Sequence, residues 1–239
     1  MSYENFAFYY DSLMDNKFYN DYYRFINNHA KFQAVLELGC GTGSMAIKMA
    51  RAKKEVYATD LSDEMLEVAR LKAMEANVDL MLRKIDMRDF EVGFQVDLVT
   101  CLCDSLNYII DKNEVFQVFN NVHNSLKHDG TFIFDVNSIY KVEHVINDYH
   151  EAESDDEFDF NWDTKYLGDG LVEHFVKILN KETGELVNEH HIQKTFPVET
   201  YRELLEKAGF GDIELYSDFQ EYQPECQRVI FVARKGAKI

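Results

Sequence analysis

The sequence feature that most constrains the fold is a glycine-rich string, VLELGCGTGS, at residues 35–44. The apolar run that leads into it is typical of a strand buried on both faces of a parallel sheet. The segment that follows, SMAIKMARA (44–52), is predicted to be a helix. Glycines at such a junction let the backbone turn tightly and approach a ligand without Cβ clashes. The string therefore predicts a ligand-binding turn at the carboxyl end of a strand.

The spacing of the glycines separates the possible cofactor classes. A dinucleotide-binding turn has the pattern G-x-G-x-x-G, whose third glycine would fall where this chain has Ser44. This departure disfavours a nicotinamide- or flavin-dependent oxidoreductase. Asp60 ends the next strand-like run, VYATD, where a carboxylate can accept hydrogen bonds from both ribose hydroxyls of an adenosine. A turn residue ahead of a helix is the alternative interpretation of Asp60.

Strand-like and helix-like segments alternate from residue 34 to residue 137, which predicts an α/β fold with a doubly wound parallel sheet. Residues 1–30 are expected to form one or two short helices ahead of this sheet. A helix over 197–210 resumes the pattern near the C-terminus. The other predicted strands are 55–60, 79–86, 95–103, 131–137, 212–219 and 227–235, and the other predicted helices are 61–76 and 112–127.

Between these two parts, residues 138–196 follow a different pattern. Polar and apolar residues alternate in FDFNWDTKYL, LVEHFVKILN and ELVNEHHIQKTF, with GDG and KETG turns between them, which predicts an antiparallel β-meander. The acidic run at 151–159 is predicted to be a solvated loop rather than a cation site. We therefore expect a main domain of 1–137 and 197–239, with an N-terminal helical cap over 1–30. The insertion, 138–196, is expected to act as a lid or as a dimer contact.

Charge and apolar content limit the partners. The 239 residues carry 25 Lys and Arg against 43 Asp and Glu, a net charge of −18, and such a surface repels phosphate backbones. No apolar run approaches the length of a spanning helix. We expect a cytoplasmic monomer or homodimer with neither a membrane partner nor a nucleic-acid partner. The cysteines are expected to be reduced core thiols, and no metal site is predicted from their spacing; they are Cys40, Cys101, Cys103 and Cys226.

Four motifs, each at a predicted strand end, resemble the ordered motifs of class I S-adenosylmethionine-dependent methyltransferases. They are Glu37-x-Gly39-x-Gly41-x-Gly43, Asp60 followed by LSDEML, Asp86-Met87, and Cys101-Leu102-Cys103-Asp104. The resemblance covers residues 33–137 and resumes over 197–235. The strings NFAFYYDSLM, CDSLNYI and FDVNS and the β-insertion resemble a bacterial subgroup similar in layout to small-molecule N-methyltransferases of the glycine or sarcosine type. The resemblance implies a Rossmann-like, mostly parallel seven-stranded sheet and S-adenosylmethionine as cofactor.

The resemblance also implies where the cofactor's methionine end binds. Glu37 would face its amino group, and the glycine loop would hold this end through backbone atoms; the loop positions concerned are Gly39, Cys40, Gly41 and Gly43. Cys103 would offer backbone to the cofactor. Tyr10, Tyr19 and Arg24 lie in a segment that folds over the pocket in similar proteins. Ordinary core or surface packing is the alternative interpretation of both tyrosines.

At the adenosine end, the resemblance implies that Asp60 accepts from the ribose hydroxyls, that Leu61 and Met65 pack on the adenine, and that Asp86 accepts from its exocyclic amine with Met87 nearby. A surface ion pair with Lys84 or Arg88 is the alternative interpretation of Asp86. Methyl transfer from a sulfonium mainly requires alignment of donor and acceptor, so no catalytic motif is compelled. The catalytic candidates at the exit of the fourth strand are Asp104, Asn107 and Tyr108, for which capping or loop hydrogen bonding is equally compatible.

Further residues are predicted to face the acceptor, and three functions stay open. Asn137 is a candidate at the exit of the fifth strand, and Trp162, Tyr166 and His174 are candidates in the insertion. Methylation of a small molecule is the first function. Methylation of RNA or protein is the second, and it would need a basic groove from residues such as Arg83, Lys84 and Arg88. A non-catalytic S-adenosylmethionine-binding module is the third, disfavoured because Glu37, the glycines and Asp60 are all present.

Overall fold

The structure is a computed structural model that describes residues 7 and 16–236. Its central sheet has eight strands among these residues, in the order β11-β10-β12-β5-β4-β1-β2-β3. Five neighbouring strands run parallel, namely β5, β4, β1, β2 and β3, and β12 is antiparallel to β5. The strands are β1 Ala34–Leu38, β2 Glu55–Asp60, β3 Met81–Lys84, β4 Val96–Cys101, β5 Leu126–Asn137, β10 Asp212–Ser217, β11 Gln220–Glu221 and β12 Arg228–Arg234. The prediction of a mostly parallel, doubly wound sheet is confirmed, with the short β11 as an eighth strand.

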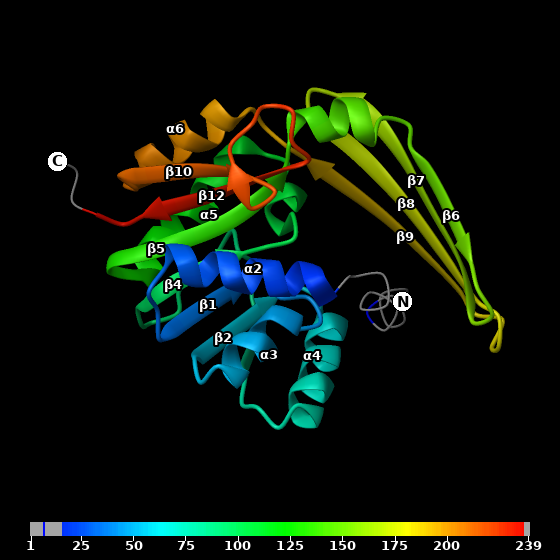
Figure 1. Cartoon of the computed structure of the whole chain (residues 1–239), viewed down its shortest axis with the longest axis horizontal. Coiled ribbons are helices and arrows are strands. Elements are labelled where there is room, and N and C mark those ends of the chain that lie inside the picture. Colours follow the sequence, from blue (N-terminus) through cyan, green and yellow to red (C-terminus); the bar gives the residue numbers. More distant parts are fainter. Residues whose placement is uncertain (1–6, 8–15, 237–239) are drawn as a thin grey trace.

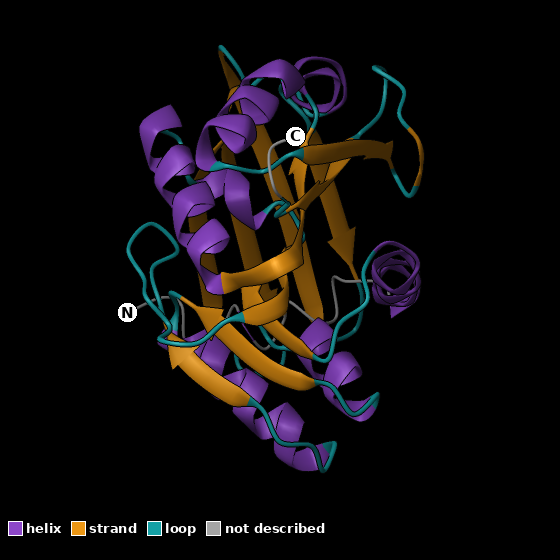
Figure 2. Ribbon diagram, turned by 90° about the vertical axis from the view of Figure 1, so that its left-hand side faces the viewer, coloured by secondary structure: helices purple, strands orange, loops and turns teal. Residues whose placement is uncertain are grey.

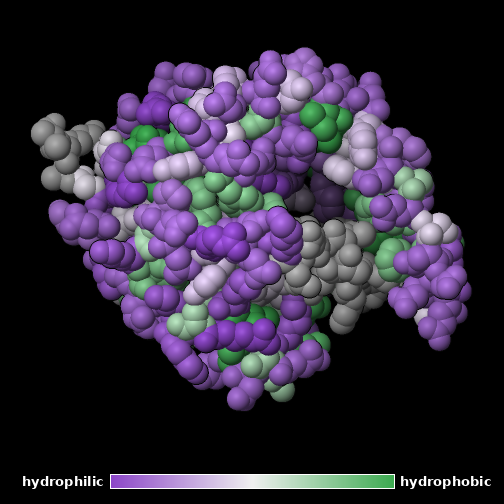
Figure 3. Space-filling model, in the orientation of Figure 1, coloured by the Kyte–Doolittle hydropathy of each residue, from purple (hydrophilic) through white to green (hydrophobic). Residues whose placement is uncertain are grey.

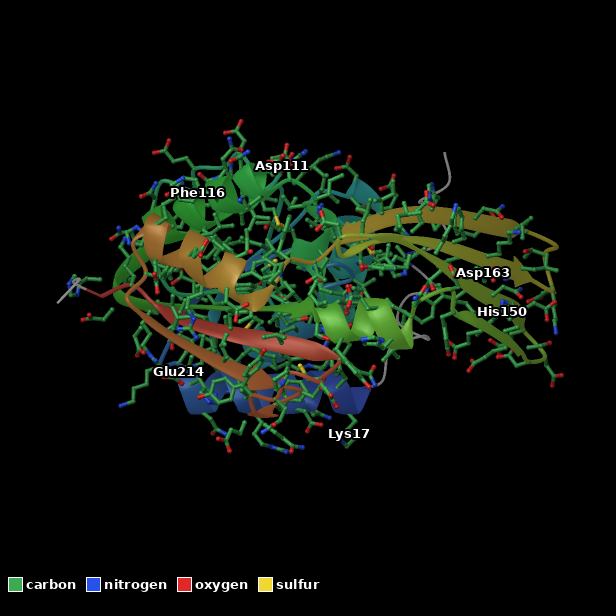
Figure 4. All side chains as sticks on the ribbon, turned by 90° about the horizontal axis from the view of Figure 1, so that it is seen from above. Lys17, Asp111, Phe116, His150, Asp163 and Glu214 are labelled. Carbon is green, nitrogen blue, oxygen red and sulfur yellow. The ribbon has the colours of Figure 1, made fainter. Side chains whose placement is uncertain are left out.

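Helices cover both faces of this sheet (Figure 2). Because successive side chains of a strand point to opposite faces, Leu36 packs under α5 and α6 while Val35 packs under α2 and α3. Asp111 caps α5 by accepting from the backbone N–H groups of Asn113 and Glu114 (Figure 4). The helices are α2 Asn16–His29, α3 Ser44–Arg51, α4 Asp63–Glu75, α5 Lys112–Ser125 and α6 Val198–Ala208, with short helical turns η1 Ser105–Tyr108 and η2 Lys141–Val145.

The insertion forms its own antiparallel sheet in the order β6-β7-β8-β9 (Figure 1), so the predicted meander is confirmed. Its strands are β6 His150–Ser154, β7 Phe158–Gly168, β8 Leu171–Asn180 and β9 Leu186–Lys194. On the face opposite to Trp162, the Nδ1 atom of His150 lies 2.6 Å from the Oδ1 atom of Asp163 on the neighbouring strand (Figure 4). Both side chains are largely exposed, so this face of the insertion is polar and solvated.

Two boundaries were predicted wrongly. The acidic run 151–159 is a loop only at residues 155–157, because its two ends belong to β6 and β7, which pair through Glu151 and Glu153 and continue the meander. The strand predicted at 131–137 begins at Leu126, where the chain pairs with Val96, and α5 therefore ends at Ser125 rather than at 127. In both places, strand pairing with a distant segment overrides the local signal.

One hydrogen bond of Thr195 joins the base of the insertion to the main sheet, and a second one closes a turn within the insertion. Thr195 donates from Oγ1 to the carbonyl of Asn137 at 2.5 Å, and its N–H donates to the carbonyl of Gly170 at 3.0 Å. Gly170 has a φ of +72°, and a Cβ built on it would lie 2.1 Å from the Thr195 carbonyl oxygen. The turn between β7 and β8 therefore requires glycine at this position.

This geometry makes Gly170 more sensitive to substitution than its neighbour Gly168, which has a φ of +90° but no heavy atom within 4 Å of a built Cβ. We expect Gly168→Ala to lose about 1–2 kcal/mol of unfolding free energy, from the left-handed backbone alone. Gly170→Ala should lose about 1–3 kcal/mol more, because its methyl group also overlaps Thr195. Urea denaturation of both variants measures the difference, and equal losses would contradict the close contact.

Candidate active site

A cavity of about 1060 Å³ lies at the carboxyl ends of β1, β2 and β4 and extends to the inner face of the insertion. In Figure 3 the molecule is hollowed between its main body and the insertion. The main sheet contributes the glycine loop and the residues that follow β2 and β4. The insertion contributes aromatic and polar side chains of β7, β8 and β9. The cavity therefore joins the part of the chain predicted to bind a cofactor with the part predicted to cover it.

Asp60 fixes the position of the glycine loop by a hydrogen bond to its backbone. The Oδ2 atom of Asp60 accepts from the N–H of Gly41 at 2.8 Å, and its Oδ1 accepts from the N–H of Ser62 at 2.9 Å. The N–H of Cys40 donates to the carbonyl of Thr59 on β2. Gly41 has a φ of +52°, and no heavy atom lies within 4 Å of a Cβ built on it. Asp60 is thus both the turn residue of one interpretation and a carboxylate at the cavity.

Glu37 is a buried carboxylate in the wall of the cavity. Its Oε2 atom has no hydrogen-bond partner among the described residues, and the whole residue is 3% exposed. Burial, and secondly the charge of Asp60, raises the pKa of Glu37 from 4.5 to about 8. A cationic group bound beside Glu37 would satisfy this oxygen and favour its ionised form. The site therefore suits an ammonium group at this position.

The two outer glycines of the loop serve different contacts. Gly39 lines the cavity, and a Cβ built on it would lie 2.8 Å from the Cβ of Ser105. Gly43 does not line the cavity; a Cβ there would lie 2.9 Å from the Cβ of Ala69 on α4. The structure thus gives Gly43 a packing role between α3 and α4, rather than the cofactor contact that was predicted.

The four residues predicted to hold the adenine, one carboxylate and three apolar side chains, all line the cavity. Asp86 lines the cavity but also contacts Arg88, whose Nη2 lies 2.6 Å from Oδ2 and whose N–H donates to Oδ1. The Arg88 hydrogen bonds lower the pKa of Asp86. The ion pair with Arg88 is therefore present, and Asp86 also lies at the cavity, where the contact with the adenine stays a prediction. The apolar side chains that line this side are Leu61, Met65 and Met87.

The exit of β4 has an unusual backbone. Cys103 and Asp104 have φ values of 57° and 52°, a left-handed conformation that costs non-glycine residues about 1–3 kcal/mol each. Asp135 of β5 stabilises it, since its two carboxylate oxygens accept the N–H groups of Cys103 at 2.7 Å and Asp104 at 2.9 Å. Asp135 is fully buried and forms an ion pair with Arg228 of β12. Both Cys103 and Asp104 line the cavity.

Of the catalytic candidates, Asp104 and Tyr108 line the cavity and Asn107 does not. Asn107 is 1% exposed; its Oδ1 accepts from the N–H of Asn137, and its Nδ2 donates to the carbonyl of Lys194, both at 2.8 Å. The structure therefore corrects the prediction for Asn107. Its side chain is used to join β5 and β9, which is the loop hydrogen bonding that the sequence left open.

The candidates from the N-terminal segment also differ in whether they line the cavity. Tyr19 lines the cavity, and Tyr10 lies outside the described residues. Arg24 does not line it; its side chain is 74% exposed and pairs with Asp21 on the outer side of α2. Five positions along a helix correspond to a rotation of about 140°, so Tyr19 and Arg24 face different sides of α2.

In the insertion, Trp162 and His174 line the cavity, as does Asn137 at the exit of β5. Tyr166 does not, because its hydroxyl donates to Glu143 at 3.0 Å and its ring packs at the base of the insertion. Several cavity residues were not predicted from sequence: Tyr22, Lys141, His191, Gln193 and Arg228. A signal existed only for Asp135, the partner of Arg228, because a charged residue inside the apolar run FIFDVN demands a buried partner.

These features define a class of protein. A doubly wound sheet whose first strand ends in a glycine loop, with carboxylates beside it at the ends of β1 and β2, is a Rossmann-like nucleoside-cofactor-binding fold. Residues 35–130 match the family model for a methyltransferase domain. Within the part of the chain that the structure describes, no helix has both the length and the apolar character to cross a membrane.

Known proteins give the family. YqeM of Bacillus subtilis (strain 168), named as a methyltransferase, is 36% identical over 100% of this chain and 99% of its own. A Geobacillus sp. (strain WCH70) protein, also named as a methyltransferase, is 34% identical over 98% of this chain and 100% of its own. The glycine/sarcosine N-methyltransferase of Aphanothece halophytica is 29% identical over 216 residues, 84% of this chain and 76% of its own.

A solved structure supports the same family. An S-adenosylmethionine-dependent methyltransferase from Clostridium acetobutylicum ATCC 824 superposes with a TM-score of 0.86 and 28% identity, covering 98% of this chain and 99% of its own. The chain belongs to the class I S-adenosylmethionine-dependent methyltransferases. S-adenosylmethionine is its cofactor, and the site fits it: the unpartnered Glu37 oxygen suits the cofactor's ammonium group, and the open space at Gly41 allows close approach to backbone.

Glu37 makes the stability of the cofactor-free protein depend on pH. Because its pKa is about 8 in the folded chain and 4.5 ordinarily, the folded state holds a proton that the unfolded state has released between these values. The free energy of unfolding contributed by this group therefore falls as the pH rises through that window. In Glu37→Gln this fall should disappear, so the variant gains stability relative to the wild type between pH 4.5 and 8.

Urea denaturation across this pH window measures the effect. Glu203→Gln is the matched control, because Glu203 is exposed on α6 and far from the cavity lining. Parallel pH profiles for the wild type and Glu37→Gln would contradict the raised pKa.

Proposed function

We propose that this enzyme transfers the methyl group to a small-molecule acceptor. The observation that carries the proposal is the cavity itself, which is walled on one side by the glycine loop and on the other by the inner face of the insertion. Its volume of about 1060 Å³ is of the size that small-molecule sites have. An acceptor that enters this cavity is surrounded by side chains of both sheets, which suits a metabolite better than a polymer.

A relative supports the same conclusion. The Aphanothece halophytica protein, which matches 84% of this chain, is named for glycine and sarcosine, both small molecules. That match includes the insertion as well as the cofactor-binding part, because 84% of the chain exceeds the main sheet alone. We therefore extend the class of acceptor, though not its identity, to this enzyme.

Two of the three basic residues that RNA or protein methylation would need are already engaged, whereas Arg83 is exposed. Lys84 pairs with Asp63, and Arg88 contacts both Asp86 and Glu114. These charges are neutralised by neighbouring carboxylates, and the net charge of the chain is −18. A phosphate backbone would gain little at this surface. Both the RNA and the protein alternatives are thereby disfavoured.

We assign the cofactor's contacts on the positions that line the cavity. Glu37 and the backbone of Gly39, Cys40 and Gly41 hold the methionine end, together with Tyr19. Asp60 accepts from the ribose hydroxyls. The adenine is held by Leu61, Met65, Asp86 and Met87, and backbone at Cys103 contributes next to the methyl group.

S-adenosylmethionine supplies a methyl group on a positively charged sulfur. The enzyme's own task is to align the acceptor with that methyl group and exclude water. Asp104 and Tyr108, at the exit of β4, are the side chains we assign to this alignment. Where the acceptor arrives protonated, the Asp104 carboxylate takes up the proton. Residues 138–196 act as the lid over a main domain of 1–137 and 197–239.

Calorimetric titration with S-adenosylmethionine tests the cofactor contacts, with S-adenosylhomocysteine as product and NADH as control. A charge-assisted hydrogen bond contributes about 1.5–3 kcal/mol, so Asp60→Ala should raise the Kd for S-adenosylmethionine about ten- to hundredfold. Asp79→Ala is the matched control, because Asp79 is exposed and outside the cavity lining. Unchanged affinity in Asp60→Ala would show that the assignment is wrong.

A labelled-methyl assay then tests the acceptor class. Wild-type protein with methyl-labelled cofactor is incubated either with a metabolite fraction or with RNA and protein fractions. Label transferred to the metabolite fraction supports the proposal. Label found only in RNA or protein would overturn it, and binding of cofactor without transfer to any fraction would favour the non-catalytic alternative.

A further inference from the structure

Lys141 places a positive charge in the wall of the cavity that no carboxylate neutralises directly. It belongs to η2, directly after β5, and its ammonium donates to the Oδ1 atom of Asn137 at 2.8 Å. No ion pair joins it to a described residue, whereas Lys84 and Arg228, which also line the cavity, each contact an aspartate. Burial lowers the pKa of Lys141. An ammonium in this position has donors left for a bound anion.

His174 supplies a second donor on the inner face of the insertion. The indole Nε1–H of Trp162 can only donate, and it lies 3.2 Å from the Nδ1 atom of His174. Nδ1 is therefore the acceptor, and the neutral ring carries its hydrogen on Nε2. Burial lowers the pKa of His174 to about 4, so the ring is neutral near pH 7. Nε2 is buried and has no hydrogen-bond partner among the described residues.

A buried N–H without an acceptor costs about 1–3 kcal/mol, so Nε2 favours a ligand atom that can accept from it. The Gln193 side chain lies near the His174 ring, and each nearby amide oxygen already accepts one hydrogen bond. Asn137 Oδ1 accepts from Lys141, and Asn137 Nδ2 donates to Gln193 Oε1 at 3.2 Å. Gln193 Nε2 donates in turn to Asp104 Oδ2 at 2.8 Å. This chain of hydrogen bonds runs from Lys141 to Asp104 along the cavity wall.

We propose that Lys141 Nζ and His174 Nε2 form a subsite for a carboxylate group of the methyl acceptor. An ammonium and a neutral ring N–H present only donors, which match carboxylate oxygens and reject a cation. Asp104 lies at the other end of the amide chain, and its charge acts on both Lys141 and His174. The substrate class is a small carboxylic acid. This inference rests on the proposed function, because it assumes that a small acceptor enters the cavity.

The remaining charges of the cavity sharpen the choice within this class. The β6 edge carries Glu151 and Glu153 toward the cavity, and both are carboxylates. They repel a molecule with two negative charges more than a zwitterion. Among small acids, we therefore expect amino acids to bind more tightly than dicarboxylates.

An intrinsic fluorophore of the chain lies beside this subsite. Trp162 is the single tryptophan of the sequence, and its indole is hydrogen-bonded to His174 and stacked on it with ring centroids 5.8 Å apart. A ligand that contacts His174 should change the emission of Trp162. Full-length protein saturated with S-adenosylhomocysteine, which has no methyl group to transfer, is titrated with glycine, β-alanine and acetate. Glycinamide, β-alaninamide and acetamide are the matched probes that lack the carboxylate, all at constant ionic strength.

We expect each acid to change Trp162 emission in a saturable way and to bind more tightly than its amide. Lys141→Met should raise the Kd for the acids about tenfold or more, because it removes a charge-assisted hydrogen bond. Lys141→Arg should restore part of the affinity. Lys177→Met is the matched control, since Lys177 is exposed on β8 on the face opposite to His174. S-adenosylhomocysteine binding, measured by calorimetry, should be equal in all four proteins.

Three outcomes would overturn the subsite. The first is a wild type in which no acid binds more tightly than its amide. The second is a Lys141→Met variant that binds S-adenosylhomocysteine and the acids as the wild type does. The third is saturation by inorganic phosphate without saturation by any acid. Failure of the wild type to bind S-adenosylhomocysteine is a separate result, which would contradict the proposed function instead.

Discussion

The buried ion pair between Asp135 and Arg228 is the interaction on which the active-site geometry depends. Asp135 accepts the N–H groups of two consecutive left-handed residues, Cys103 and Asp104, and so holds the exit of β4 in a conformation that its own sequence disfavours. A fully buried carboxylate is tolerated only when its charge is compensated, and Arg228 of β12 compensates it. Strands β4, β5 and β12 are thereby coupled where Cys103 and Asp104 line the cavity.

The side of the cavity at the glycine loop and the side toward the insertion differ in charge. The cofactor side carries Glu37 and Asp60, both with raised pKa values because burial opposes their ionisation. The side toward the insertion carries the ammonium of Lys141 and the neutral donor of His174. Amide groups of Asn137 and Gln193 connect the two sides without adding charge. The site therefore separates a region suited to cations from one suited to anions, within one cavity.

Local sequence was sufficient for the parts of the site that short-range spacing defines. The glycine loop, Asp60 and Asp86 each follow a strand, and parallel strands bring their carboxyl ends to one edge of the sheet, so their proximity was predictable. Arg24 and Asn107 show where this reasoning stops. Both lie near cavity residues in sequence, but the rotation of α2 turns Arg24 outward, and the docking of β9 withdraws Asn107 into a structural hydrogen bond. Lys141 and Gln193 were not predicted as cavity residues. Their position at the cavity depends on how the insertion folds back onto the main sheet, which no local sequence pattern encodes.

The insertion also has a mechanical property. Strands β7, β8 and β9 contain 11, 10 and 9 residues, so at about 3.3 Å per residue the sheet is roughly 30 Å long. It is fastened to the main sheet at its base, through Thr195, Asn107 and the turn at Gly170. Because the sheet is attached only near one end, a rotation of about 10° at the base would displace its far end by roughly 5 Å. Small changes at Asn137 or Thr195, at the base of the insertion, would thus become larger displacements at the far end of the sheet.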